Sequence, residues 1–158
     1  MITIVIDTRE QTPWAFPREL AHSAVGTLKT GDYALAGDSE FAIERKSLDD
    51  FVGTISSGWE RFRREIDRMK CFQVKVIIVE GRLLQCCFHE REQALEAPEH
   101  NHWKVSPQFI LKQVAIMTMA GVSVLFADTV DVATGLAYAI LKERSEQLNG
   151  TDSAKNQG

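Results

Sequence analysis

Two acidic residues in this sequence are spaced as facing positions of a β-hairpin. Strand-like runs at 32–36 and 40–46 lie on either side of Asp38, in a cluster of turn-type residues. If the turn is centred on Asp38, then Asp32 and Glu44 are equidistant from it and face each other across the ladder. Carboxylates in directly opposite positions, with Cβ atoms about 5 Å apart, repel each other. The pair is therefore a candidate site for a divalent cation that would offset this repulsion.

Lys46 extends the same strand face, because it lies two residues beyond Glu44 and side chains alternate along a strand. A hard cation such as Mg²⁺ takes one or two carboxylates and completes its shell with water and phosphate oxygens. Such an ion can activate water and neutralise a phosphoryl group, which is the chemistry of phosphodiester hydrolysis. Lys46 can position the attacking water. The alternative is a solvated outer face of an amphipathic hairpin, and a slip of one residue in register would separate the two acids.

The other face of the hairpin is apolar and is expected to pack on the core. It carries Tyr33, Leu35, Phe41 and Ile43. Arg45 lies two residues beyond Ile43 on the same strand, so its side chain is expected on this face and to point away from the acid pair.

Apolar runs and helical periodicities outside the hairpin predict an α/β fold. Buried strands are expected at 2–6, 24–28, 74–79 and 122–127. Helices are expected from the Ser47 cap, over 59–70, over 107–120, and from 128–131 to Leu148. Strands that alternate with helices indicate a central mixed β-sheet flanked by helices in one domain, 1–148. The segment 82–105 is the least regular, with a short helix expected around 90–97, and the polar residues 149–158 are expected to form a disordered tail.

Composition excludes several classes of protein. The chain has 158 residues, 44% of them hydrophobic, which is enough for one globular domain with a full core. No stretch has the apolar length that spans a bilayer, and the N-terminus lacks the basic region of a signal peptide, so we expect a cytoplasmic protein. The three cysteines have no C-x-x-C spacing; Cys86-Cys87 with His89 and His100-x-His102 fits no established zinc pattern. Reduced thiols are therefore the favoured interpretation.

The acid pair lies within a longer motif. Gly31-Asp32, then Glu44-Arg45-Lys46, then Asp50 after three residues, resembles the GD…ERKxxxD signature of the XPF-type nuclease domain, the family of the XPF, MUS and Hef nucleases. The resemblance extends from Asp7-Thr8-Arg9-Glu10 to the helix that ends near Leu148. It implies a restriction-endonuclease-like fold, with a central mixed β-sheet between helices.

The resemblance also implies an activity. It predicts a DNA endonuclease that depends on Mg²⁺ or Mn²⁺ and cuts branched DNA such as flaps, forks and junctions. Asp32 and Glu44 would be metal ligands, together with the backbone carbonyl of Arg45. Two alternatives remain open: a non-catalytic scaffold of the same fold that dimerises or binds DNA, and a recombination or restriction nuclease that acts on other DNA. The presence of Asp32, Glu44, Lys46 and Asp50 argues against the scaffold, because inactive relatives typically lose the metal carboxylates.

Two further acids have both a structural and a catalytic interpretation. Asp50 is the third residue after the Ser47 cap and can stabilise the helix start by about 1 kcal/mol. As the last residue of the XPF-type motif, Asp50 would instead point toward the metal. Asp7 follows a core strand and can cap the next turn, but the family has an acidic residue here beside the metal, so we include Asp7 among the catalytic residues. Arg9 and Glu10 are weaker candidates.

Basic residues with helical spacing follow the motif. Arg61, Arg64 and Arg68 lie on one side of the helix expected at 59–70 and are candidates for phosphate contact. The alternative is a solvated helix face on which neighbouring acids offer ion pairs. The net charge of −4 is unusual for a protein that binds DNA alone, because phosphate affinity comes mainly from lysine and arginine.

The resemblance implies partners as well. XPF-type domains pair through their C-terminal region, and the helix at 107–120 is apolar nearly all round, so a homodimer or heterodimer through the C-terminal helices is expected. These enzymes usually carry a helix-hairpin-helix DNA-binding domain after the nuclease domain. None follows residue 148, so we expect a partner to contribute DNA affinity. The protein would be nucleoid-associated or phage-encoded.

Overall fold

The structure is a computed structural model that describes residues 1–68, 74–87 and 103–155. Its centre is a six-stranded sheet in the order β2-β1-β3-β4-β5-β6. The strands are β1 (Ile2–Asp7), β2 (Ala21–Gly26), β3 (Tyr33–Leu35), β4 (Phe41–Ser47), β5 (Val74–Glu80) and β6 (Val122–Ala127). The helices are α1 (Leu48–Ile55), α2 (Trp59–Arg68), α3 (Leu84–Cys87), α4 (Pro107–Met119) and α5 (Val130–Lys155). Among the described residues, no helix has the length and apolarity that crossing a membrane requires.

The sheet is mixed, as the alternation of strands and helices predicted. β1 pairs in parallel with β2, whereas β3 is antiparallel to both β1 and β4. β4, β5 and β6 are parallel to one another. The central hairpin thus joins two parallel parts of the sheet.

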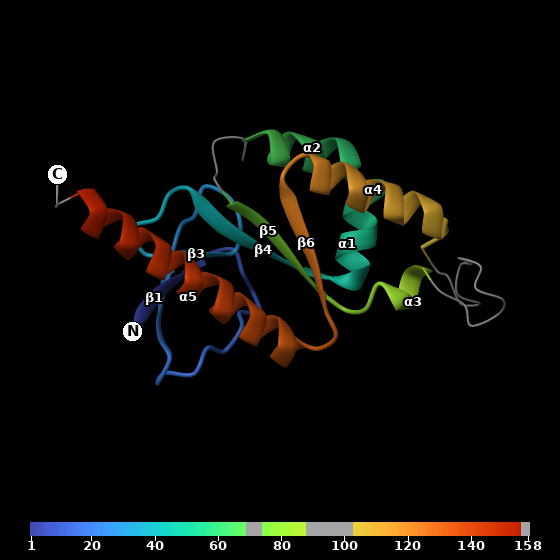
Figure 1. Ribbon diagram of the computed structural model, residues 1–158. Helices are drawn as coiled ribbons and strands as arrows, with labels where there is room; N and C mark the ends of the chain where they lie inside the picture. The colour runs from blue at the N-terminus through green and yellow to red at the C-terminus, as the bar shows by residue number, and fades with distance from the viewer. Residues whose placement is uncertain (69–73, 88–102, 156–158) are drawn as a thin grey trace.

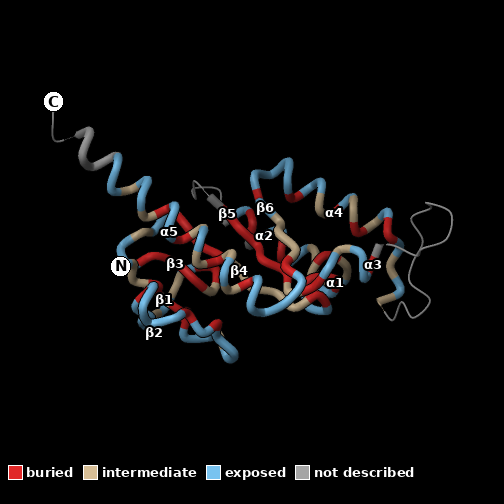
Figure 2. The backbone as a smooth tube through the Cα atoms, turned by 60° about the horizontal axis from the view of Figure 1, so that its bottom comes forward, coloured by how far each residue is buried: buried red, intermediate tan, exposed pale blue. Residues whose placement is uncertain are grey.

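Helices cover both faces of the sheet (Figure 1). α5 lies across one face and packs on β1, β3, β5 and β6, while α1 and α4 pack on the other. The alternation of β5 shows the two layers: Val76 and Ile78 belong to the core under α5, and Ile77 and Val79 belong to the core under α1, α2 and α4. Buried residues are concentrated in the strands and on the inner sides of the helices (Figure 2).

The predicted hairpin register is confirmed. Tyr33 pairs with Ile43, which is the pairing expected for a turn centred on Asp38. Both side chains are fully buried in the core under α5. The same register places Asp32 opposite Glu44, on the face that α1 and α2 cover.

The predicted helix starts are also confirmed. The Ser47 hydroxyl accepts a hydrogen bond from the Asp50 amide at 3.1 Å, and the Ser106 hydroxyl accepts one from the Phe109 amide at 3.2 Å. Pro107 occupies the first turn of α4, where its missing N–H costs nothing. Because α1 begins directly after β4, its first turn lies beside the carboxyl end of that strand.

Two expectations differ from the structure. The second strand occupies Ala21–Gly26 and not 24–28, because it pairs in register with all of β1. α5 continues to Lys155, into the segment expected to be a disordered tail from 149. The helix expected around 90–97 lies outside the described residues.

The buried side of α5 also differs from the sequence pattern. Val132, an apolar residue in the first turn of the helix, is 53% exposed. Ala133, Ala137 and Leu141 are fully buried instead. The two small alanines allow the helix to lie close to the sheet, which a pattern of large apolar residues does not reveal.

Candidate active site

The acid pair and the lysine meet at the carboxyl end of β4. The Lys46 Nζ lies 3.0 Å from the Glu44 Oε1, and each side chain is 14% exposed. The Lys46 ammonium also lies 5.5 Å from the centre of the Phe62 ring, on α2. The salt bridge and the cation–π contact hold the ammonium beside Glu44.

Asp32 carries an unfavourable charge in this position. Burial raises the pKa of Asp32 to about 7, and the adjacent negative charges of Glu44 and Glu10 contribute to the rise. Its Oδ2 accepts a hydrogen bond of 2.8 Å from the Arg45 backbone amide. Within the described part of the chain, no lysine or arginine side chain is hydrogen-bonded to this carboxylate. The repulsion expected from the sequence is therefore present in the fold.

The donor set fits a hard divalent cation. Among the described residues, no group of three or more histidine, cysteine, aspartate or glutamate side chains is arranged to hold a metal ion. Mg²⁺ does not need such a group, because it often binds through one or two carboxylates and keeps its waters. The raised pKa of Asp32 indicates a site that favours added positive charge.

Of the residues considered for zinc, the structure describes the side chain of Cys86. Cys86 is buried, and its thiol donates to the Leu83 carbonyl at 3.3 Å. His89, His100 and His102 lie outside the described residues.

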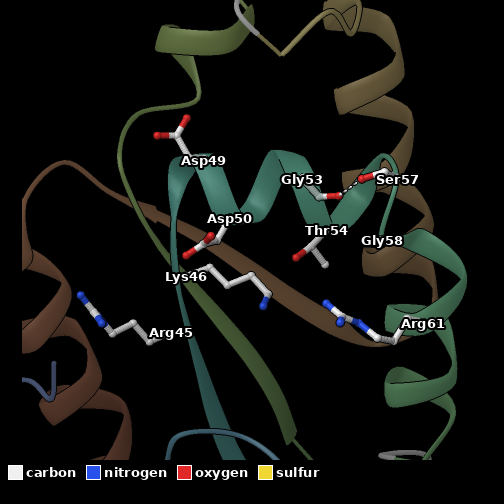
Figure 3. Close-up of a pocket in the computed structure, with 9 residues that line it drawn as sticks. All are labelled: Arg45, Lys46, Asp49, Asp50, Gly53, Thr54, Ser57, Gly58 and Arg61. Carbon is white, nitrogen blue, oxygen red and sulfur yellow. Dashed lines mark hydrogen bonds between the residues drawn. The ribbon is translucent and has the colours of Figure 1, made fainter. Parts of the chain in front are cut away.

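A second charged cluster, which no sequence pattern predicted, lies on the other face of β4. Arg45 points away from Lys46, as expected (Figure 3). It donates from Nε and Nη2 to the two carboxylate oxygens of Glu80, at 2.8 and 3.0 Å. The Trp14 indole donates to Glu80 at 2.6 Å, and Trp14 stacks on Tyr33 with ring centroids 4.5 Å apart. Glu80 is the last residue of β5, and its position directly after the apolar run 74–79 was its only signal in the sequence.

Glu10 belongs to this region as well. Its Oε1 accepts hydrogen bonds from the Thr12 amide at 2.8 Å and from Arg45 Nη1 at 3.3 Å. Its charge also contributes to the raised pKa of Asp32. Glu10, a weaker candidate from the sequence, thus acts on the charge of Asp32.

The Asp7 carboxylate accepts hydrogen bonds from nearby groups of the protein. Its Oδ1 accepts from the backbone amide and Nε of Arg9, at 2.9 and 2.6 Å, and its Oδ2 accepts from the Leu28 amide at 2.7 Å. The bond from Arg9 lowers the pKa of Asp7 to about 2. The Asp7 amide donates to the Asp32 carbonyl at 2.9 Å. Asp7 therefore ties the end of β1 to the loop before the hairpin, which is the capping interpretation.

Asp50 and Arg61 lie around a cavity of about 610 Å³ beside Lys46 (Figure 3). The cavity is lined by Arg45, Lys46, Asp49, Asp50, Gly53, Thr54, Ser57, Gly58 and Arg61. Arg64 is exposed and does not line it, and the side chain of Arg68 is not described. Of the three arginines expected to contact phosphate, the fold thus brings one to the cavity.

The fold and the residue arrangement define the class of protein. A mixed sheet between two helical layers, with an acid, an acid-x-lysine pair and a following helix at one strand end, is the restriction-endonuclease-like architecture of an XPF-type nuclease domain. The solved structure of XPF from Aeropyrum pernix superposes with a TM-score of 0.64 at 18% sequence identity, covering 96% of this chain and 69% of that chain. This likeness establishes the fold.

The family is established by sequence. A family model of the ERCC4 domain matches residues 6–139, so the chain belongs to the ERCC4 domain family. The matched range includes every element from the end of β1 to the middle of α5. A comparison with curated proteins gives no significant match.

Proposed function

We propose that this protein is a divalent-metal-dependent DNA endonuclease that cuts branched DNA. One observation carries the metal dependence: Asp32 and Glu44 face each other, partly buried, with the pKa of Asp32 raised to about 7. Two carboxylates that face each other in a domain of the ERCC4 family are suited to bind a divalent cation. The preference for branched DNA comes from the family resemblance.

Each residue of the motif has a role in this proposal. Asp32, Glu44 and the Arg45 carbonyl would hold Mg²⁺ or Mn²⁺, which supplies activation of water and neutralises charge on the phosphoryl oxygens. Lys46, held between Glu44 and Phe62, orients the attacking water and lies against the scissile phosphate.

The remaining candidates act around this centre. Asp50 stabilises the start of α1 and lines the cavity next to Lys46. Asp7 acts as a positioning residue, because its backbone amide holds the Asp32 carbonyl and its side chain is used within the fold. Arg61 is the arginine placed to contact DNA phosphate, while Arg64 and Arg68 stay secondary candidates.

Cleavage of labelled DNA tests the proposal. We expect the protein to cut flap, fork or junction DNA with Mg²⁺ or Mn²⁺ and to show no cutting in EDTA, because the acid pair alone cannot activate water. The measurement is gel analysis of flap, fork, junction, duplex and single-stranded substrates at equal concentration.

Two results would contradict the proposal in different ways. Cutting that persists in EDTA removes the metal from the mechanism. Binding of branched DNA without cutting in any metal supports the scaffold alternative. Equal cutting of duplex and branched DNA would instead place the protein with nucleases that act on other DNA.

We also propose that the protein dimerises through its C-terminal helices. Four apolar side chains are exposed on α4 and the start of α5: Ile116 at 40%, Met119 at 88%, Val130 at 51% and Val132 at 53%. Ile116 and Met119 lie on α4 and Val130 and Val132 on α5, which cover opposite faces of the sheet, so each pair is a separate candidate contact with a partner chain.

Sedimentation equilibrium checks the dimer. We expect a dimer at tens of micromolar, and we expect Met119→Glu to shift the population toward monomer, since it buries a charge in the interface. Glu146→Lys, on the exposed polar side of α5, is the matched control. A wild-type protein that sediments as a monomer at this concentration would overturn the dimer proposal.

A further inference from the structure

We propose that the cavity beside the acid pair binds a second phosphodiester of the DNA strand, next to the one that is cut. The second phosphate would lie between Arg61 and the Gly53–Thr54 face of α1. This inference rests on the proposed function, since it names the path of the substrate past the catalytic residues.

The cavity is separate from the acid pair but continuous with it through one residue. Asp32 and Glu44 do not line it, whereas Lys46 does and is bonded to Glu44 at 3.0 Å. Its volume of about 610 Å³ is within the range of sites that bind small ligands. A strand with its scissile phosphate at Lys46 would therefore continue into the cavity.

Two positively charged side chains of the cavity face each other. Lys46 and Arg61 point toward each other from opposite walls, with the Thr54 side chain between them (Figure 3). Within the described residues, Arg61 makes no hydrogen bond or ion pair, so its guanidinium donors are available. A guanidinium beside a hydroxyl group is a suitable site for phosphate oxygens.

The acidic residues of the cavity lie toward the start of α1. The Asp49 carboxylate accepts a hydrogen bond of 2.6 Å from the Trp103 indole, and Asp50 follows it in the first turn of the helix. Thr54 lies one helical turn further along, toward Arg61 (Figure 3). The second phosphate is thus expected at the Arg61 end, away from the two acids.

Gly53 leaves room for a DNA strand beside α1. It lies inside α1, where alanine is more favourable than glycine. It does not have a positive φ, and a Cβ built on it would meet no atom within 4 Å. Nothing in the described protein therefore requires glycine, and Gly53 lines the cavity. Because glycine has no side chain, a sugar–phosphate backbone can pass close to α1 at this position.

Gly135 supplies a matched control. It also lies within a helix, α5, and a Cβ added to it would also meet no atom within 4 Å. Alanine at either position should raise the melting temperature by about 2 °C. Only the substitutions at Gly53 should affect DNA.

The test is a charge series at Gly53, read as DNA affinity in EDTA by fluorescence anisotropy and as KM and kcat with Mg²⁺. We expect Gly53→Gln to weaken DNA binding and to raise KM, each about tenfold. Gly53→Glu should change both values about a hundredfold. Gly53→Lys should bind DNA at least tenfold more tightly than Gly53→Gln. The kcat should change less than threefold. The same substitutions at Gly135 should change no value more than twofold.

Salt dependence gives an independent readout. Arg61→Gln should reduce the slope of log affinity against log salt by about one, because one phosphate contact is lost. Arg63→Gln is the control, since Arg63 is exposed and paired with Glu60 at 3.0 Å. Its slope should stay at the wild-type value.

The outcomes separate this inference from the proposed function. Suppose that the wild type cuts DNA but that the affinities of the Gly53 variants do not decrease in the order Lys, Gln, Glu. This result would overturn the second phosphate site and leave the nuclease proposal unaffected. DNA binding in EDTA that follows this order, in a protein that never cuts, would support the site and contradict the nuclease. Equal effects at Gly53 and Gly135 would also overturn it.

Discussion

Replacement of Asp32 by asparagine is expected to reduce DNA cleavage at least about 100-fold and to stabilise the metal-free protein. Cleavage falls because one of the two carboxylates proposed to hold the metal is lost. Stability rises because the negative charge of Asp32 is unfavourable when no cation is present. The carboxylate is partly buried, and it is repelled by Glu44. A gain in stability together with a loss of function is the opposite of what a structural carboxylate would give.

The stability difference should depend on pH in a defined direction. The pKa of Asp32 is raised from 3.8 to about 7 in the folded protein. Between these values the folded state keeps a proton that the unfolded state has lost, so wild-type stability falls as pH rises from about 4 to about 7. Asparagine does not titrate, and the variant lacks this fall. At pH 8 we expect the variant to be more stable by about 2 kcal/mol, a figure reduced for the partial exposure of the site.

Urea unfolding at pH 5 and pH 8, with and without Mg²⁺, measures this effect. Mg²⁺ should stabilise the wild type and leave Asp32→Asn unchanged, because a ligand stabilises only the folded state that binds it. Glu40→Gln, an exposed acid of the same hairpin, is the matched control and should retain both cutting and the response to Mg²⁺. A variant that loses stability at pH 8, or that still responds to Mg²⁺ like the wild type, would refute the metal role of Asp32.

Removal of the Glu80 charge is expected to cost about 3 kcal/mol of folding stability. Glu80 accepts two hydrogen bonds from Arg45 and one from the Trp14 indole, and the Arg45 and Glu80 side chains are only 18% and 12% exposed. Glu80→Gln leaves the Arg45 guanidinium largely buried with a weaker partner, which is the costly case. Cleavage should fall about tenfold as well, because the amide of Arg45 holds Asp32 in place.

Denaturant unfolding compares this variant with an exposed ion pair. Glu60→Gln breaks the bond to Arg63, where the side chains are 69% and 59% exposed, and should change stability by less than about 0.5 kcal/mol. The double variant Arg45→Met with Glu80→Met should recover most of the stability, because an apolar pair replaces a buried ionic one. If Glu80→Gln is no more destabilising than Glu60→Gln, the cluster has no structural role.

Local patterns in the sequence predicted much of the site. The alternation of apolar and charged residues on either side of Asp38 predicted which side chains share a face, and the pairing of Tyr33 with Ile43 confirms the register. Ser47 predicted the start of α1, and its hydroxyl caps the Asp50 amide. These features depend on residues close in sequence, whose geometry is set by the strand period and by helix capping.

Contacts between distant segments could not be predicted in this way. Arg45 and Glu80 are 35 residues apart, and Trp14 and Glu80 are 66 apart. They meet because β4 and β5 are parallel neighbours and the loop after β1 folds over their ends. No spacing along the chain encodes that approach.

The hairpin, its two faces and the placement of Asp32, Glu44 and Lys46 on one of them thus follow from the order of residues along the chain, because each depends on a short-range repeat of the backbone. The groups that surround these residues are known only from the packed fold: Phe62 beside Lys46, Glu80 beside Arg45, and the cavity along Gly53. The packed fold also shows that Asp7 is held by Arg9 and Leu28. The physical reason is that the electrostatics of a buried charge depend on every group nearby in space, and only the packed fold brings those groups together.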